Sequence, residues 1–286
     1  MNLTFVQTAD PFFYADMVAV TSQTVRTYAQ RHGARYELYL GLKQGAFPWQ
    51  ATFNRVFLLK ELIDRGTQGW VCYMDADAWV EDLSFDVAAY LRDKDGCAGI
   101  FTPSMATENW WDVNAGVFFL NLSHEVGVAF ANQWLSACQA AWWRVADMPT
   151  FPAGGPDDQS ILHEILIDGD YQAHLRLESP ALINSASASF IRQHLRSNAS
   201  DMKSRLRHIK DEVGRVLNGQ IGGVSQDDLT RACQINDALY QGLLNRPADG
   251  GAENQYVRVL LNHGLRDGVE LVAKYLTGSA EFRALR

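Results

Sequence analysis

The chain has 286 residues, of which 47% are hydrophobic and 20% are charged. This composition excludes a disordered chain and allows one large core, or one core with a small satellite domain. A formal net charge of -8 argues against a general nucleic-acid binder, whose surface would be basic. No run approaches the roughly 18 apolar residues of an integral membrane segment, and the N-terminus lacks the pattern of a secretion signal. The four cysteines form no CxxC pair. We therefore expect a cytoplasmic protein with reduced thiols.

The first hundred residues alternate strand and helix patterns. A helix is predicted from Pro11 to a stop at Gly33, and a second over 52–64, with Gly66 as its stop. Strands are predicted at 3–7, 35–40, 70–74 and 98–101. Such alternation predicts an α/β fold, with a mostly parallel sheet covered by helices on both faces.

The second half begins with an apolar run at 116–120 and a helix through the 120s and 130s. The stretch NGQIGGVSQDD, residues 218–228, is Gly-rich and polar, which is typical of a linker. Beyond it lie short helical patterns at 232–243, 256–261 and 269–276. We therefore predict a catalytic domain over 1–217 and a small all-α domain over 226–286.

Two carboxylates stand at the end of an apolar strand in the sequence WVCYMDADAWV, residues 70–80. Asp75 and Asp77 are two residues apart, so in an extended chain they point to the same side. Ligands of open α/β sheets bind beyond the carboxyl ends of the strands, where paired carboxylates could hold a divalent cation and a substrate diphosphate. The alternative is structural: Asp75 starts a turn and Asp77 caps a short helix.

Three motifs follow one another in the order YMDADA at 73–78, NAGVFFLN at 114–121 and DDQSIL at 157–162. Together they resemble the retaining nucleotide-sugar glycosyltransferases of the Rossmann-like GT-A fold, over about residues 1–215. The sequence is similar both to the bacterial glycogenin-like enzymes and to the fungal and plant α-galactosyl- and mannosyltransferases. The resemblance implies hexose transfer from a UDP- or GDP-sugar to a glycan, protein or small-molecule acceptor, with Mn²⁺ or Mg²⁺ as cofactor.

The same resemblance implies roles for individual residues. Expected metal ligands are Asp75, Asp77 and His194. Expected nucleotide-sugar contacts are Thr8, Ala9, Asp10, Tyr14, Arg55, Asp75, Ala76, Asn114, Ala115 and Gly116. Expected catalytic residues are Gln159, Asp158 and Asp77. The family's HxxGxxKPW motif is incomplete around His194, so this histidine could equally be a packed residue. Diphosphate charge would then be met by Arg192, Arg196 or Arg205.

The stereochemical expectation rests on Gln159, which the resemblance places beneath the anomeric carbon. An amide cannot act as a general base near neutral pH, so front-side attack with retention is expected. Asp157 or Asp158 is the alternative, since a carboxylate that reached the acceptor would invert the centre. Trp110 and Trp111 are expected to contact the acceptor or to belong to the core.

The C-terminal residues resemble a short helical repeat of unassigned role found in bacterial surface and glycan-related proteins. The matching positions are Tyr240, Leu243, Leu244, Arg246, Asp249, Gly250, Tyr256, Ser279, Glu281 and Phe282. Because this repeat has no established chemistry, we expect a docking or packing module, or one that recruits the acceptor.

Other functions fit the sequence less well. A DxD-type phosphatase would not explain NAGVFFLN, and a nucleotidyltransferase would need a Gly-rich basic loop after the first strand. A catalytically inactive nucleotide-sugar-binding scaffold stays open.

Overall fold

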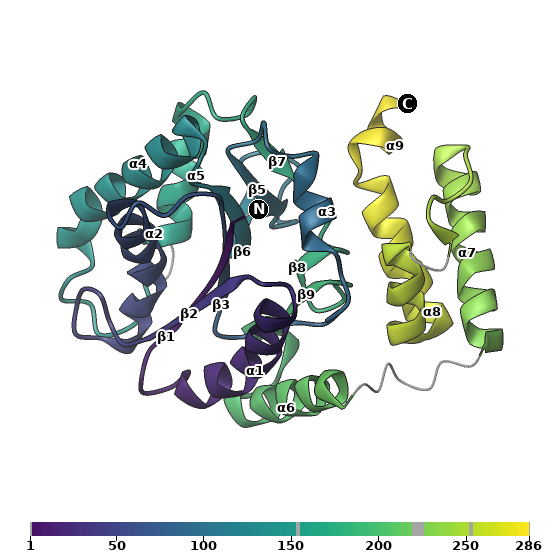
Figure 1. Ribbon diagram of the computed structural model, residues 1–286, viewed down its shortest axis with the longest axis horizontal. Coiled ribbons are helices and arrows are strands. Elements are labelled where there is room, and N and C mark those ends of the chain that lie inside the picture. Colours follow the sequence, from purple (N-terminus) through teal and green to yellow (C-terminus); the bar gives the residue numbers. More distant parts are fainter. Residues whose placement is uncertain (1, 153–154, 219–225, 252–253, 286) are drawn as a thin grey trace.

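A central six-stranded sheet organises the protein in the computed structural model, which describes residues 2–152, 155–218, 226–251 and 254–285 (Figure 1). The strand order is β2-β1-β3-β6-β5-β7. The strands are β1 (Leu3–Ala9), β2 (Arg35–Leu40), β3 (Trp70–Asp75), β5 (Gly99–Pro103), β6 (Val113–Asn121) and β7 (Leu175–Leu177). Only β6 runs antiparallel to its neighbours among these strands. The predicted α/β fold with a mostly parallel sheet is confirmed.

Helices cover both faces of this sheet. The helices α2 (Asn54–Asp64), α4 (Glu125–Ala141) and α5 (Asp158–Asp168) cover one face, and α1 (Ala15–Arg31) and α3 (Val87–Arg92) the other. Val71 and Tyr73 of β3 pack toward the first set, whereas Cys72 and Met74 pack toward the second. Because both faces are buried, β3 is apolar throughout instead of alternating.

A second sheet was not predicted. It has the order β4-β9-β8, formed by β4 (Ala78–Val80), β8 (Ile183–Ser185) and β9 (Ile191–Gln193). Strands of three residues are too short to show a periodic pattern. The pairing of Ala78 with Gln193 carries residues from the 190s to the end of β3. Helix α6 (Met202–Leu217) follows and packs against α1.

The C-terminal helices are α7 (Gln226–Leu244), α8 (Gln255–Thr277) and α9 (Ala280–Ala284). The sequence predicted two helical segments where the structure has the single span α8. Within this span, a Cβ on Gly268 would lie 2.9 Å from the Cα of Leu260, so the glycine allows a close approach of backbone. Most of the predicted linker, 219–225, lies outside the described residues. Within the described parts of the chain, no helix has the length and apolar character needed to cross a membrane.

The C-terminal helices contact the α/β part through α8. Arg258 forms an ion pair with Asp82 at 2.9 Å between Nη2 and Oδ2. The Tyr275 hydroxyl lies 2.9 Å from Ser187 Oγ, next to the three-stranded sheet. Ala181 is buried in the same hydrophobic cluster as the inner residues of α7 and α8. Three short 3-10 turns complete the described elements: η1 (Pro48–Phe53), η2 (Trp142–Arg144) and η3 (Arg196–Asn198).

Candidate active site

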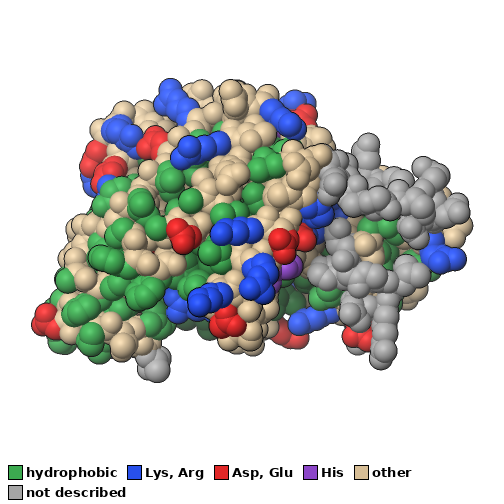
Figure 2. Space-filling view, turned by 90° about the horizontal axis from the view of Figure 1, so that it is seen from below, with side chains coloured by type: hydrophobic (Ala, Val, Ile, Leu, Met, Phe, Trp, Pro, Cys, Tyr) green, Lys and Arg blue, Asp and Glu red, His purple; other side chains and the backbone are tan. Residues whose placement is uncertain are grey.

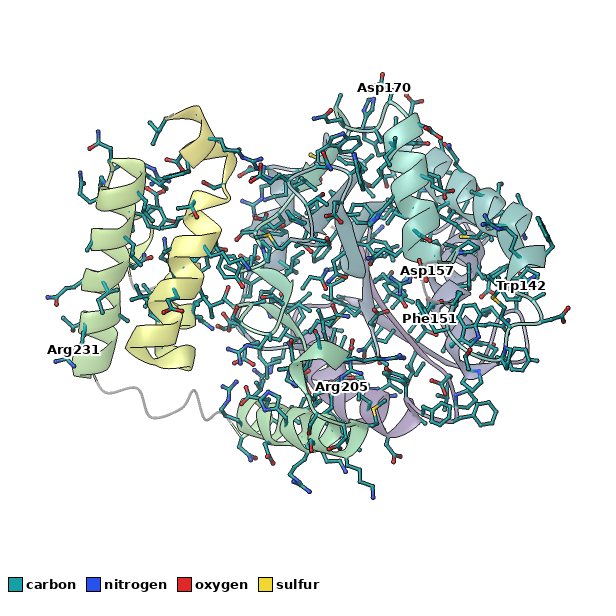
Figure 3. The ribbon with its side chains drawn as sticks, turned by 180° about the vertical axis from the view of Figure 1, so that it is seen from behind. Trp142, Phe151, Asp157, Asp170, Arg205 and Arg231 are labelled. Atoms are coloured by element: carbon teal, nitrogen blue, oxygen red, sulfur yellow. The ribbon has the colours of Figure 1, made fainter. Side chains whose placement is uncertain are left out.

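A cavity of about 960 Å³ opens beyond the carboxyl ends of β1 and β3 and extends to α6. This is the position where open α/β sheets bind ligands, and the volume suits a large ligand. Eight residues expected from the sequence line it: Thr8, Ala9, Asp10, Tyr14, Arg55, Asp75, Ala76 and Asp77. Arg205 lines it from α6 and Phe151 from the segment before α5; both are labelled in Figure 3.

Each carboxylate of the DxD motif faces a guanidinium. Asp75 Oδ1 accepts hydrogen bonds from Arg55 Nη2 at 3.0 Å and from the Tyr73 hydroxyl at 3.0 Å. Asp77 Oδ2 accepts from Arg205 Nη2. Burying carboxylates without such partners would be costly, so the two arginines explain how a buried strand can end in acidic residues.

Gln193 bridges the two carboxylates. Its Nε2 donates to Asp75 Oδ2 at 3.2 Å and to Asp77 Oδ1 at 3.0 Å. Its Oε1 is buried and has no hydrogen-bond partner among the described residues. Gln193 was not among the residues expected at the site, whereas its neighbour His194 was. Side chains alternate along a strand, so Gln193 and His194 point to opposite sides.

Arg55 joins the motif to α5. Its Nε–H donates to Thr52 O at 3.1 Å, so its 2.9 Å contact with Asp158 Oδ2 is an ion pair without a hydrogen bond. Its Nη1 donates to Ala115 O. Burial lowers the pKa of Arg55, but the carboxylates of Asp158 and Asp75 outweigh burial and raise it above its ordinary value. Arg55 is therefore a permanently charged link between Asp75 of the first motif, Ala115 of the second and Asp158 of the third.

Burial also acts on the acids. It raises the pKa of Asp158 to about 7, against the opposing effect of Arg55. Burial, with the neighbouring charge of Asp75, raises the pKa of Asp77 to about 6. Burial therefore makes the charged forms of these two acids more costly than in water, and the neighbouring arginines offset only part of that cost.

The residues expected from the second and third motifs do not line the cavity, in contrast to Asp75, Asp77 and Arg55. These second- and third-motif residues are Asn114, Ala115, Gly116, Asp158 and Gln159. Gln159 Oε1 accepts from Ala115 N at 3.0 Å, which fixes the start of α5 against β6. A Cβ on Gly116 would lie 2.3 Å from Gln193 Nε2. The space that this glycine leaves is thus filled by Gln193, where close approach of a donor sugar was expected.

The ring of His194 is not brought together with the carboxylates of Asp75 and Asp77, although its backbone N–H donates to Asp77 O at 3.1 Å. Its ring packs on His208 of α6, with the centroids 4.4 Å apart, and it does not line the cavity. Burial, with smaller effects from His208 and Arg205, lowers its pKa to about 4, so the ring is neutral. Across the described ranges, no cluster of three His, Cys, Asp or Glu side chains could hold a metal ion.

The three candidate arginines are placed differently. Arg196 and Arg205 line the cavity, and both donate to the Tyr14 hydroxyl, at 2.7 Å from Nε and 3.0 Å from Nη1. Arg192 is paired with Glu81 and Glu212 away from the cavity. Only the first two are therefore placed to meet a diphosphate.

Two carboxylates still fit a divalent cation. Asp75 Oδ2 and Asp77 Oδ1 converge on one amide nitrogen, which shows that both oxygens can face one point. Carboxylate oxygens are the ligands that Mn²⁺ and Mg²⁺ prefer, and such ions usually keep waters and phosphate oxygens as further ligands.

The opposite wall of the cavity is apolar. Trp49 and Phe151 pack edge to face with centroids 5.6 Å apart, and the exposed Phe13 lines the same cavity. Figure 2 shows many hydrophobic side chains on the face seen from below, with Lys and Arg near its middle. Trp110 and Trp111 lie elsewhere: Trp110 borders a separate cavity of about 200 Å³, and Trp111 packs against His163. The aromatic residues of this wall were missed.

No family model matches the sequence, and no match was found among curated proteins. Among solved structures, the chain is similar to a glycosyltransferase involved in the glycosylation of the major capsid of PBCV-1. The TM-score is 0.56 and the identity 15%, covering 74% of this chain and 100% of that one. A likeness at this identity shows a shared fold.

Two structures of the glycosyltransferase GlyE of Streptococcus pneumoniae TIGR4 also match. Their TM-scores are 0.48 and 0.46, at 13% and 14% identity, covering 76% and 77% of this chain. The match spans 63% of each GlyE chain, which is less than two thirds.

Proposed function

We propose that the protein is a nucleotide-sugar-dependent hexosyltransferase. The observation that carries this proposal is the charged floor of the cavity, where Asp75 and Asp77 lie beside Arg55 and Arg205 at the carboxyl ends of β1 and β3. Guanidinium groups bind phosphate through paired hydrogen bonds, so the floor suits a nucleoside diphosphate such as that of a UDP- or GDP-sugar. The fold shared with a glycosyltransferase supports the same class.

Each part of the donor has a proposed partner. Thr8, Ala9, Asp10 and Tyr14 would meet the nucleoside, because they follow β1 and line the cavity. Asp75 and Asp77 would hold Mn²⁺ or Mg²⁺, which offsets charge on the departing diphosphate. Arg205 and Arg196 would donate hydrogen bonds to the phosphate oxygens. Arg55 would keep Asp75 in place, since it donates to Oδ1 of that residue.

Retention of configuration is proposed because no general base is available on the α5 side. Asp158 is 3% exposed and paired with Arg55, so it cannot reach an acceptor hydroxyl. Asp157 Oδ1 accepts from Ser160 N at 2.6 Å and caps α5. Gln159 cannot take a proton near neutral pH. We therefore propose that the departing diphosphate accepts the acceptor's proton.

The aromatic wall is proposed as the acceptor side. Aromatic rings offer flat apolar faces that stack on sugar rings, and Trp49 is fixed by its Nε1 hydrogen bond to Met148 O at 2.8 Å. The acceptor would thus be a glycan, or a protein or small molecule with an apolar face. The C-terminal helices, whose role is untested, would dock or recruit it.

The proposal is tested by incubating the full chain with a panel of UDP- and GDP-hexoses and Mn²⁺, and measuring release of the nucleoside diphosphate. Release from one donor is expected, and NMR should show that the product keeps the α-configuration of the donor. Nucleotide binding without release would favour the inactive scaffold. Release of inorganic phosphate from simple phosphate esters would favour the DxD-type phosphatase.

A further inference from the structure

Gln193 is the starting point, because its amide lies against both carboxylates of the DxD motif. It is 2% exposed and comes from β9, which pairs with β4 directly after the motif. Strand pairing therefore holds the backbone of Gln193 beside the motif, and the side chain reaches Asp75 and Asp77 from there. The position that a third ligand would need is filled by an amide.

The other end of this amide has no partner. Gln193 Oε1 is buried and accepts no hydrogen bond from the described residues. Buried polar atoms are almost always paired, so an unpaired carbonyl oxygen beside two carboxylates calls for an explanation. Rotation about the soft terminal torsion of glutamine would exchange Oε1 and Nε2, and would turn the oxygen toward the carboxylates.

Gly116 makes room for the amide. A Cβ at this position would stand 2.3 Å from Nε2 and 2.4 Å from Oε1 of Gln193. Gly116 of the second motif thus leaves the space in which the Gln193 amide contacts Asp75 and Asp77 of the first motif. Any larger residue there would push a flexible side-chain end aside without disturbing backbone.

We propose that Gln193, and not His194, is the third protein ligand of a divalent cation held by Asp75 and Asp77. Resting on the proposed function, this inference names the ligand set of the same site. With the amide rotated, the set is two carboxylates and one amide carbonyl, the all-oxygen donors that Mg²⁺ and Mn²⁺ favour. His194 has no part in it, because its ring lies against His208.

Arg205 is part of the same inference. It donates to Asp77 Oδ2 from α6, and its Nε donates to His194 O at 2.7 Å. A guanidinium and a divalent cation bound to one carboxylate repel each other. Cation binding therefore competes with the Arg205–Asp77 pair and frees the guanidinium for a phosphate in the cavity.

The test measures Mn²⁺ binding to the full chain by the loss of the free Mn²⁺ signal in electron paramagnetic resonance, with the metal alone as probe. Gln193→Ala should weaken binding at least about tenfold, the lower end for a disturbed metal shell. Gln193→Glu, nearly the same size, should tighten binding because it adds a charged oxygen. Gly116→Ala keeps all three proposed ligands but should weaken binding by displacing Gln193.

The matched control is His194→Gln, the adjacent residue, which should leave Mn²⁺ affinity within about twofold. Arg205→Gln should tighten binding, since it removes the competitor. Circular dichroism of each variant establishes that it is folded. Loss of binding in His194→Gln, or unchanged binding in folded Gln193→Ala, would overturn the assignment.

A result in which neither the wild type nor Arg205→Gln binds Mn²⁺ would also overturn it, and would leave Arg205 as the cation of the site. This readout is independent of turnover. Donor hydrolysis that persists in chelator would leave glycosyl transfer standing while the metal site fell. Mn²⁺ binding without any donor hydrolysis would support the metal site and contradict the proposed glycosyl transfer.

Discussion

Two networks of buried charge lie on either side of β9, and they differ in balance. One contains Arg192 and Arg215 with Glu81 and Glu212, so two guanidiniums meet two carboxylates, and none of the four lines the cavity. The other contains Asp75, Asp77 and Asp158 with Arg55 and Arg205, so three carboxylates meet two guanidiniums. The formal charges of the first network cancel, whereas those of the second leave one negative charge without a positive partner in the network.

The difference separates a structural network from a ligand site. A balanced network lowers the cost of burying its own members and does nothing more. Surplus negative charge must be met by a proton or a cation. Burial, the main cause of the raised pKa values of Asp77 and Asp158, makes a proton easier to bind there as pH falls. Charge imbalance next to a cavity is therefore more informative than the DxD pattern alone.

The largest expected effect comes from removing a carboxylate of the unbalanced network. Asp77→Asn should reduce donor hydrolysis by at least about 10²-fold, because a group that stabilises charge in the transition state is lost. Glu212→Gln, the same chemical change in the balanced network, should leave the rate constant nearly unchanged. Initial rates of diphosphate release measure both, and equal losses in the two variants would erase the distinction.

The balanced network should matter for stability instead. Glu81 is buried and contacts both Arg192 and Arg215. Glu81→Gln should lower the free energy of unfolding by about 3 kcal/mol, because Arg192 and Arg215 are left to share the single carboxylate of Glu212. Glu37→Gln breaks the exposed pair with Arg65 and should cost less than about 1 kcal/mol. Urea denaturation compares them, and a Glu81 loss no larger than the Glu37 loss would contradict the prediction.

A smaller effect is expected from Asp158 and depends on pH. Its pKa rises from an ordinary 3.8 to about 7 on folding. Between these values the native state binds a proton that the unfolded chain has lost, so stability falls as pH rises and levels off above about 7. Asp158→Asn lacks this loss and should gain on the order of 2 kcal/mol relative to wild type between pH 4 and pH 8. A loss of stability of Asp158→Asn relative to wild type over this range would mean that Arg55 lowers the pKa of Asp158 more than burial raises it.

The smallest effect is expected where the C-terminal helices meet the α/β part. The Arg258–Asp82 pair is partly exposed, with side-chain exposures of 36% and 14%. Arg258→Gln should change the unfolding free energy by less than about 1 kcal/mol and leave hydrolysis unchanged. Thermal unfolding monitored by circular dichroism checks this. A larger drop would show that this contact is essential to the fold.

The longer strands of the main sheet and the helices α1, α2 and α4 could be predicted because each shows a periodic pattern or a continuous apolar run, whereas β7, α3 and α5 were not predicted. The apolar 70–74 run and the helix over 52–64 correspond to β3 and α2. The first-motif residues and Arg55 follow directly from those elements, and they line the cavity.

The partners of the carboxylates could not be predicted in the same way. Gln193 reaches Asp75 and Asp77 through a three-residue strand whose register depends on tertiary pairing. A shift of one residue in that strand decides whether Gln193 or His194 faces the site, and the sequence alone does not contain that register. Trp49 was missed for a similar reason, because it lies in the turn η1 before α2.

The stretch from Ser187 to Gln193 has a mechanical consequence. Ser187 holds the Tyr275 hydroxyl of α8 at 2.9 Å, and six residues later Gln193 touches both carboxylates. Between them lie a turn and β9. A displacement of the C-terminal helices would therefore reach the cavity floor through β9, beside the contact that Arg258 makes with Asp82 after β4. A chain that ends before α7 would therefore lose the contact of Tyr275 with Ser187, which precedes β9, in addition to the C-terminal helices themselves.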